Sequence, residues 1–380
     1  MKITGVTTYV LEGLLKDKAF GWSQWVTDRR QTALCVISTD EGIEGVGEAF
    51  FIGGPASIAA YMIKEAYAPL LVGRDPLQTS VIWDFLYNRT RDQGRKGLPI
   101  SALSAVDIAL WDIKGKALGL PVYQLLGGAY RSRARVYATG LYEPQVPDKK
   151  KALVEEALGY KKDGFPAMKL KVGYGIETDM EYVQAVREAI GDRMLLMVDA
   201  NHAYNAAEAI RLARRMEDCN VYWLEEPVPP EDIDGYVEVK QKSNLLITGG
   251  ECEFTRFGFR ELVTRRAVDI LQPDLCAAGG FTEMMRIVAL ANAWNVPVIP
   301  HVWGTSIGLA AALQLFAALP HFPDRRFAAE PFFEYDRSPH PFRDRTSKEK
   351  FVMKDGYLAI PDRPGLGVTL DMDYIRKNAV

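Results

Sequence analysis

The sequence predicts an α/β fold, in which a (β/α)8-type barrel follows an N-terminal α+β capping domain that the C-terminal segment completes. Two observations favour this fold. After Gly127 and Gly128, strand-like apolar runs alternate with helical periods, and each run ends on a polar or charged residue. No G-x-G-x-x-G turn follows any of these runs, so a closed barrel is favoured over an open dinucleotide-binding sheet.

The domain boundaries follow from where the pattern changes. We expect the capping domain at residues 1–125, the barrel with the active site at 126–335, and a segment that returns to the capping domain at 336–380. A chain of 380 residues exceeds a usual single domain, and a barrel of about 250 residues leaves room for a second one.

The capping domain begins with alternating strand patterns. We expect three antiparallel strands, at residues 3–11, 32–39 and 44–49. The loop at 14–30 is rich in aromatic and basic residues, which suits either a lid over a pocket or a surface that packs on the neighbouring domain. Helical periods follow between residues 57 and 119, with Ser101 as the predicted N-cap of the last long helix.

Each predicted barrel strand is short and apolar. The strands are expected at residues 136–139, 166–172, 195–198, 221–224, 245–248, 268–272, 296–300 and 327–329. Amphipathic helices separate them. Beyond Glu330, the runs 351–353 and 357–360 flank a Lys-Asp-Gly turn and are predicted to form a hairpin that reaches back to the first domain.

The composition excludes several classes of protein. A net charge of −3 and a pI near 6.0 argue against nucleic acid or an anionic membrane as the main partner. No stretch of 18 apolar residues predicts a membrane span, and the first residues lack the apolar core of a signal peptide. The four cysteines show no C-x-x-C spacing. We therefore expect a cytoplasmic protein with reduced thiols and a small-molecule partner.

Three acidic residues organise the predicted barrel. Asp199, Glu225 and Glu251 each follow an apolar run, at equal intervals of about one βα unit. The C-terminal ends of parallel barrel strands form one rim, on which active sites are built. Three unrelated surface acids would not repeat in this way. Because no His or Cys cluster accompanies them, these oxygen ligands suit Mg²⁺, or Mn²⁺, rather than Zn²⁺.

Two lysines are predicted to reach the same rim. Lys169 and Lys171 are two residues apart on one strand, so their side chains share a face. Two close cations depress each other's pKa, which would suit one of them to act as a base. The alternative is a pair at a strand end that extends to solvent.

His301 and Asp274 follow the seventh and sixth predicted strands. A carboxylate that accepts from one imidazole nitrogen fixes the tautomer and makes the other nitrogen more basic. A lone His is more often structural, but the Asp274 partner and the opposing lysines favour a functional role. Bases on both sides of a metal that holds a substrate carboxylate predict removal of the proton α to that carboxylate.

The sequence resembles the enolase superfamily, in its mandelate racemase/muconate lactonizing enzyme group. The residues that carry the resemblance are Lys169-x-Lys171, Asp199-Ala200-Asn201, Glu225-Glu226-Pro227, Gly250-Glu251, Asp274, His301 and the run Ser104-Ala105-Val106-Asp107-Ile108-Ala109-Leu110-Trp111-Asp112. The superfamily's use of a Lys or His base with Mg²⁺ is a general pattern. The resemblance covers essentially the whole chain.

The resemblance implies a role for each site residue. Asp199, Glu225 and Glu251 would be the Mg²⁺ ligands, Lys171 the base on one face with Lys169 in support, and His301 with Asp274 the base or acid on the other. Glu330, in Ala329-Glu330-Pro331, would donate a hydrogen bond to the substrate carboxylate, which requires its protonated form. Asn201, His202 and Trp303 would contact the substrate. Members of the group often form even-numbered homo-oligomers.

The activity implied by the resemblance is that of an acid-sugar lyase or isomerase. The first hypothesis is cycloisomerisation of an aldarate lactone such as galactarolactone, a β-elimination that yields a 3-deoxy-2-keto acid. The alternatives are an acid-sugar dehydratase and a racemase or epimerase. A binding protein on an inherited barrel would not need every one of these polar residues, and a metal-dependent hydrolase would need His ligands or a second metal. Cys252, which follows a predicted ligand, is interpreted as a packed thiol.

Overall fold

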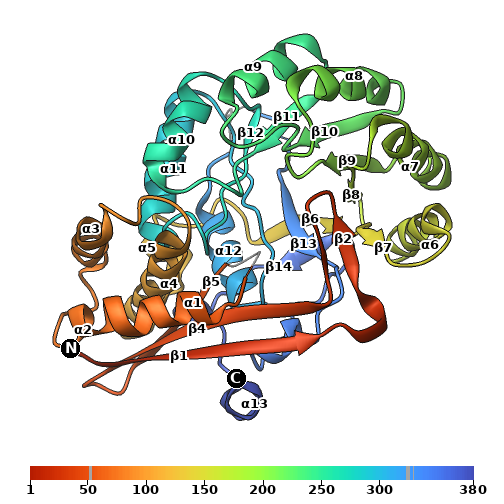
Figure 1. The fold of residues 1–380 in the computed structure, drawn as a ribbon. Coiled ribbons are helices and arrows are strands. Elements are labelled where there is room, and N and C mark those ends of the chain that lie inside the picture. The colour runs from red at the N-terminus through yellow and green to blue at the C-terminus, as the bar shows by residue number, and fades with distance from the viewer. Residues whose placement is uncertain (51–53, 322–325, 328) are drawn as a thin grey trace.

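The N-terminal domain of the computed structural model is an antiparallel sheet covered by helices (Figure 1). The model describes residues 1–50, 54–321, 326–327 and 329–380. Strands β1 (Ile3–Leu14), β4 (Arg29–Thr39) and β5 (Glu44–Ala49) form the sheet in the order β1-β4-β5. The three predicted strands lie within these elements.

The predicted loop at 14–30 contains a short 3-10 helix, η1 (Lys16–Lys18), and a small hairpin. Strands β2 (Phe20–Trp22) and β3 (Trp25–Thr27) pair with each other, and β2 also pairs with β7 (Glu143–Pro144) after the first barrel strand. An aromatic-rich sequence favours the extended backbone, and pairing with a distant segment stabilises it. The hairpin therefore joins the two domains.

Six helical segments follow the sheet. They are α1 (Ser57–Tyr61), the π-helix η2 (Met62–Tyr67), α2 (Ala68–Leu71), α3 (Thr79–Thr90), α4 (Leu98–Leu118) and α5 (Val122–Leu125). Helix α4 begins at Leu98, so Ser101 lies inside it and is not its N-cap as predicted. Pro99 is in the first turn, where its missing N–H costs nothing, and this permits the earlier start. A Cβ on Gly47 would lie 1.9 Å from the Ala105 carbonyl oxygen, so β5 packs directly on the α4 backbone.

The second domain is a barrel of parallel strands inside a ring of helices (Figure 1). Its strands are β6 (Arg133–Thr139), β8 (Ala167–Lys171), β9 (Leu195–Asp199), β10 (Val221–Glu225), β11 (Leu246–Gly249), β12 (Ile270–Leu271) and β13 (Phe332–Asp336), paired in the order β12-β11-β10-β9-β8-β6-β13. The seventh predicted strand appears as two parallel bridges, Leu271↔Val298 and Asp274↔His301. This arrangement confirms the predicted fold class.

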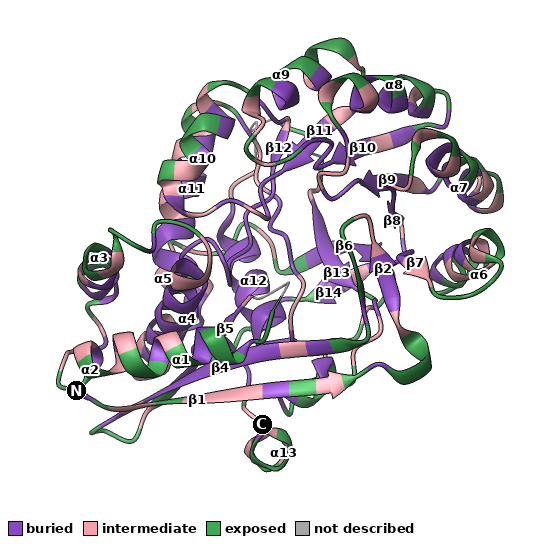
Figure 2. Ribbon diagram, viewed as in Figure 1, coloured by how far each residue is buried: buried purple, intermediate pink, exposed green. Residues whose placement is uncertain are grey.

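The barrel helices bury one face each against the strands. They are α6 (Lys149–Lys162), α7 (Ile176–Ile190), α8 (Ala206–Glu217), α9 (Ile233–Lys242), α10 (Thr255–Thr264), α11 (Gly280–Ala293) and α12 (Ser306–Ala318). Figure 2 shows that the strands are buried while most of these helices expose their outer faces. Helix α12 is buried along its whole length, because it lies between the barrel and the N-terminal domain.

The eighth barrel strand lies further along the chain than predicted. Of the expected strand at 327–329, Phe327 is exposed in a turn and residue 328 lies outside the described residues. The strand is β13, which is buried throughout and runs parallel to β6. Pro331 cannot donate to a strand ladder, and the aromatic run that follows it has a stronger strand preference than Phe-Ala-Ala. The sequence prediction was therefore wrong in position.

The C-terminal segment contacts both domains. It contains the 3-10 helix η3 (Arg343–Arg345), β14 (Tyr357–Ala359) and α13 (Met372–Asn378). Strand β14 pairs antiparallel with β6 of the barrel, and residues 351–353 are not a strand, so the predicted hairpin is wrong. The chain end does reach the first domain, since the Val380 N–H donates to the Val10 carbonyl at 2.9 Å.

Two further expectations concern membranes and thiols. Within the described ranges, no helix has the length and apolar character needed to cross a membrane. Cys35, Cys219, Cys252 and Cys276 are free thiols, and all but Cys252 are buried.

Candidate active site

Three carboxylates converge at the C-terminal ends of neighbouring barrel strands. Asp199 ends β9, Glu225 ends β10 directly beside it, and Glu251 follows β11. One oxygen from each side chain lies within 4.8 Å of the others, and all three residues are buried. Parallel pairing in register brings these ends together, as the equal spacing predicted.

The chemistry of this cluster fits a hard divalent cation. Carboxylate oxygens are the ligands that Mg²⁺ prefers. Among the described residues, the buried Oε2 of Glu251 accepts no hydrogen bond, although His301 Nε2 lies 3.3 Å away, so this oxygen keeps a lone pair for a metal ion. Burial raises the pKa of Glu225 to about 7, because its charge has lost its contact with water. Asp199, Glu225 and Glu251 are therefore the residues that would hold Mg²⁺.

The two lysines of β8 lie among these carboxylates. Lys171 Nζ contacts Asp199 Oδ2 and donates to Asn201 Oδ1 at 2.8 Å. Lys169 Nζ lies below, 2.6 Å from Glu225 Oε1. Both ammonium groups are buried on one face of the strand, as predicted.

The predicted depression of the lysine pKa values is not found. Burial alone would lower the pKa of Lys171, but the charge of Asp199 more than offsets this and the pKa is raised. The pKa of Lys169 is raised in the same way, by Glu225 and then Glu334. The physical reason is that the carboxylates around the pair outweigh the repulsion between the two ammonium groups.

His301 lies on the other flank of the carboxylates. Its Nδ1 is 2.7 Å from Asp274 Oδ2, and its Nε2 is 3.3 Å from Glu251 Oε2. Burial would lower the pKa of the imidazole, but Glu251, Glu334 and Asp274 raise it to about 10. These carboxylates therefore favour the protonated imidazole, and Nε2 is directed towards Glu251.

Glu330 does not reach this site. It precedes β13, and its Oε2 accepts a hydrogen bond from the Tyr357 hydroxyl at 2.8 Å, at the N-terminal end of the strands. The acidic residue that β13 brings to the site is Glu334, which is fully buried. The error follows from the misplaced strand, since an offset of four residues moves a side chain from one end of the barrel to the other.

Glu334 is the residue that the sequence interpretation missed. It lies 3.0 Å from Lys169 Nζ and accepts from the Val302 N–H at 2.8 Å. Burial would raise its pKa, but Lys169 and His301 lower it, so it is ionised and cannot donate to a substrate carboxylate. The signal that could have found it is an acid at the centre of an aromatic strand, Phe332-Phe333-Glu334-Tyr335.

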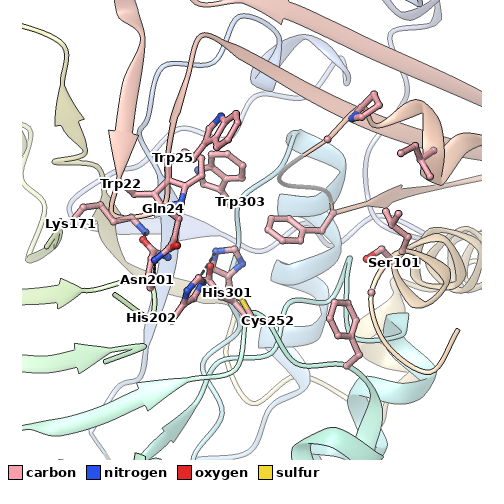
Figure 3. A pocket seen from close by; sticks show the side chains of 18 of the residues that line it. Trp22, Gln24, Trp25, Ser101, Lys171, Asn201, His202, Cys252, His301 and Trp303 are labelled. Atoms are coloured by element: carbon pink, nitrogen blue, oxygen red, sulfur yellow. Dashed lines mark hydrogen bonds and ion pairs between the residues drawn. The ribbon is translucent and has the colours of Figure 1, made fainter. Parts of the chain in front are cut away.

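The site opens into a pocket of about 670 Å³. Figure 3 shows Lys171, Asn201 and His301 close together on one side of it, with Ser101 across from them. Trp22, Trp25, Phe50, Phe254 and Trp303 supply much of its apolar lining. Polar and charged groups line other parts of it, among them Lys171, Asn201 and His301, so the pocket combines an apolar wall with a few polar groups, as small-molecule sites do.

The hairpin β2–β3 covers this pocket and is fastened to its rim. Ser23 Oγ donates to the Ala200 carbonyl at 2.8 Å, and Gln24 Nε2 donates to the Asn201 carbonyl at 3.2 Å. Trp22 lies 6.2 Å from Trp303, measured between ring centroids. The sequence suggested that this segment is either a lid or a surface that packs on the neighbouring domain. In the structure it lies above the pocket and also packs against the barrel.

The three predicted substrate contacts all line the pocket. They are Asn201, His202 and Trp303. Asn201 and His202 have positive φ angles of 41° and 54°, which non-glycine residues seldom adopt and which cluster at functional sites. The buried Nε1 of Trp303 has no acceptor among the described residues, so it is available to one from a ligand.

Comparisons with known proteins identify the family of both domains. Residues 8–127 match the family described as mandelate racemase / muconate lactonizing enzyme, N-terminal domain, and residues 152–374 match the family described as enolase C-terminal domain-like. D-galactarolactone cycloisomerase from Agrobacterium fabrum is 44% identical over 375 residues, which cover 99% of this chain and 98% of that protein. Arabinonate dehydratase from Saccharolobus solfataricus is 36% identical, over 88% of this chain and 87% of that protein.

A solved structure resembles the whole chain. The crystal structure of the 3,6-anhydro-D-galactonate cycloisomerase from Zobellia galactanivorans has a TM-score of 0.90 and 42% sequence identity, with 100% of each chain covered.

Proposed function

Since the chain belongs to the mandelate racemase/muconate lactonizing enzyme group of the enolase superfamily, we propose that it opens the ring of a cyclic acid sugar by β-elimination. The observation that carries the proposal is that Lys171 and His301 line one pocket on opposite flanks of the three buried carboxylates. The favoured substrate is an aldarate lactone such as galactarolactone, or an anhydro acid sugar, and the product is a 3-deoxy-2-keto acid.

The side chains divide the proton transfers between them. Lys171 Nζ takes the proton from the carbon α to the substrate carboxylate, and the released electron pair forms the double bond to the β-carbon. The bond from the β-carbon to the ring oxygen breaks, and His301 Nε2, held as a cation, protonates that oxygen. The resulting enol then becomes the ketone, so the product has the composition of the substrate.

Mg²⁺ on Asp199, Glu225 and Glu251 would stabilise the negative charge that develops on the substrate carboxylate. It would also offset the charge of Asp199, which keeps Lys171 protonated. Asp274 orients His301, and Lys169 holds Glu225 in place. Asn201 and Trp303 contact the substrate's oxygen atoms, and His202 lies beside them.

Two alternatives give different products. An acid-sugar dehydratase would expel water, so its keto product is lighter than the substrate by one water. A racemase or epimerase would return the proton to the same carbon and form no ketone. Mass spectrometry together with semicarbazide trapping of the 2-keto acid separates the three outcomes.

The test of the proposal is proton exchange in D₂O with Mg²⁺, with galactarolactone and 3,6-anhydrogalactonate as substrates. We expect the keto product to carry one solvent deuterium on the β-carbon, which takes a proton as the enol becomes the ketone, and to keep the heavy-atom composition of the substrate. Lys171→Ala and His301→Asn are expected to lower turnover by about 10²–10⁴-fold, whereas Lys162→Ala, on an exposed helix surface, is expected to act as wild type. Undiminished turnover in both site variants would refute the assignment.

We also propose that the chain forms an even-numbered homo-oligomer, as the family resemblance implies. Light scattering of the purified protein measures this directly. A monomer at micromolar concentration would contradict it.

A further inference from the structure

A second cluster of potential metal ligands lies beside the three carboxylates. It consists of His202, Glu226 and Cys252, each of which offers one ligand atom within 4.8 Å of the other two. Each follows a member of the first cluster in the chain: His202 after Asp199, and the other two directly after Glu225 and Glu251. Neither the proton-transfer chemistry nor the first metal site uses these three side chains as ligands.

The backbone explains why consecutive residues can serve two neighbouring clusters. In a regular strand, adjacent side chains point to opposite faces. His202 and Glu226 have positive φ angles of 54° and 42°, which end the strand alternation at those positions. Adjacent carboxylates of Glu225 and Glu226 can then face neighbouring sites instead of opposite sides of the sheet.

Glu226 is a buried carboxyl whose charged form is opposed by its surroundings. Its side chain is 1% exposed, and among the described residues its one polar side-chain contact is Cys252 Sγ, 4.0 Å from Oε2. The strongest charges near it are the carboxylates of Glu251, Asp199 and Glu225. A buried carboxylate in such surroundings is costly unless a cation compensates it. One of its carboxyl oxygens lies within 4.8 Å of a ligand atom of His202 and of one of Cys252.

The cluster is accessible from solvent. His202 and Cys252 both line the pocket, and Figure 3 shows them side by side next to His301. An ion can therefore enter from the pocket, and its remaining coordination position would face the substrate.

The donor set differs in kind from that of the first site. Imidazole nitrogen, thiolate sulfur and one carboxylate oxygen suit borderline-soft cations, whereas three carboxylates suit Mg²⁺. The three ligand atoms lie within 4.8 Å of one another. Tetrahedral bonds of about 2.0–2.3 Å to one ion would require them to be closer by roughly 1 Å, and rotation of the side chains can supply that movement. We propose that His202, Glu226 and Cys252 form a second metal site, which takes a thiophilic divalent cation such as Zn²⁺.

Binding at this site replaces a proton with a metal. The Sγ–H bond of Cys252 breaks as the sulfur–metal bond forms, and the proton leaves to solvent. Nothing is oxidised or reduced. The proposal does not depend on which sugar the enzyme opens, so it can fail while the proposed function stands.

Cobalt absorption spectroscopy tests the site directly. The full-length protein, first saturated with Mg²⁺, is titrated with Co²⁺, and we expect a near-ultraviolet thiolate-to-cobalt band that Zn²⁺ displaces. The band should vanish in Cys252→Ser and remain in the matched control Cys219→Ser, whose thiol is buried elsewhere. Loss of a residue that only supports a metal ligand lowers metal affinity by roughly 10–100-fold. Because Cys252 would be a ligand itself, Cys252→Ser should lower the Zn²⁺ affinity measured by calorimetry by at least as much.

A second variant keeps the test decisive if Cys252→Ser is unstable. Glu226→Gln retains the thiol and the imidazole but removes the charge, and it should weaken Zn²⁺ binding by a similar factor while Mg²⁺ binding persists. Absence of a thiolate band in the wild-type protein, or a band that survives in Cys252→Ser, would overturn the proposal.

Discussion

At the residue scale, the orientation of His301 depends on groups that do not touch the substrate. Asp274 Oδ2 lies 2.7 Å from Nδ1, while Asp274 Oδ1 accepts from the Cys276 N–H at 2.6 Å. The backbone therefore holds the carboxylate, and the carboxylate holds the imidazole. Nε2 is thereby directed towards Glu251 Oε2, 3.3 Å away, and His301 lines the pocket.

This arrangement makes Asp274 a positioning residue with a specific kinetic signature. Asp274→Asn should lower kcat by about 10²–10⁴-fold, because an amide can favour the wrong tautomer of His301. KM should change little, since Asp274 does not line the main pocket. Steady-state kinetics on a cyclic substrate, such as galactarolactone, measures both constants. A raised KM with an unchanged kcat would show that Asp274 acts in binding instead.

At the element scale, the acidic residues of the α4 motif act between domains. Asp107 accepts from the N–H and the hydroxyl of Thr282, at the N-terminal end of α11 in the barrel. Asp112 accepts from the Val46 and Leu366 N–H groups, at 3.0 and 2.9 Å. A carboxylate that bridges backbone donors of two elements fixes their separation. The motif that suggested the family is thus a structural junction rather than part of the chemistry.

The β2–β3 hairpin is the element that closes the pocket. Ser23→Ala combined with Gln24→Ala removes its hydrogen bonds to the Ala200 and Asn201 carbonyls. Each bond contributes about 0.5–1.5 kcal/mol, so we expect KM to rise by about 10-fold and limited proteolysis to cut the hairpin faster.

Kinetics of the double variant are compared with those of Gln241→Ala, an exposed change on α9. Mg²⁺ affinity, measured by calorimetry, should stay the same, because the three carboxylates are untouched. Equal KM values in the double variant and wild type would show that the hairpin does not hold the substrate.

At the scale of the whole molecule, one buried ion cluster joins three parts of the chain. Asp336 ends β13, and its Oδ2 lies 2.6 Å from Arg343 of η3 and 3.4 Å from Arg30 of β4. The Arg30 guanidinium also stacks on Trp303, 3.5 Å from the ring centroid. Capping domain, barrel and C-terminal segment therefore meet beneath the pocket wall.

This cluster makes stability depend on pH in a defined direction. Burial alone would raise the pKa of Asp336, but Arg343 and Arg30 outweigh it, so the folded pKa lies below 3.8. A carboxyl with a depressed pKa contributes stability above its unfolded pKa and loses it as pH falls through the folded value. At pH 7, Asp336→Asn should therefore cost about 3–5 kcal/mol, because two guanidinium groups lose their buried partner.

Urea unfolding of Asp336→Asn and wild type, from pH 7 downwards, measures this cost. The difference in unfolding free energy should narrow below about pH 4, where the Asp336 carboxyl of the unfolded wild-type chain begins to be protonated while that of the folded protein is still ionised. Asp362→Asn, an exposed substitution, should show no such difference. A gap that stays constant with pH would argue against an ionic role for Asp336.

Metal binding should stabilise the fold as a whole. The three buried carboxylates would bind Mg²⁺ only when the barrel brings them together, so saturating Mg²⁺ should raise the free energy of unfolding. At 100 times Kd the gain is about 2.7 kcal/mol, which calorimetry would record as a higher Tm that EDTA reverses. Asp199→Asn should lose this response. An equal Tm with and without Mg²⁺ would exclude a metal at this site.

The resemblance and the equal spacing of Asp199, Glu225 and Glu251 were enough to predict the barrel and the acidic cluster. The spacing could be seen in the sequence because it is a local pattern: an apolar run followed by a polar residue marks each strand end. The pairing of His301 with Asp274 could be inferred in the same way, because parallel neighbours place their ends together.

Other features were decided only by tertiary structure. Glu334, and not Glu330, reaches the site because the last barrel strand is β13, whose position is fixed by pairing with β6. The local strand preference of the sequence does not reveal that pairing. The lysine pKa values rise because carboxylates from β9, β10 and β13 surround them, and two residues on one strand carry no information about that field. The same convergence brings His202, Glu226 and Cys252 together. The sequence determines which side chains stand at the end of each strand. The protonation state of each side chain and the groups that it contacts depend on all the strands together.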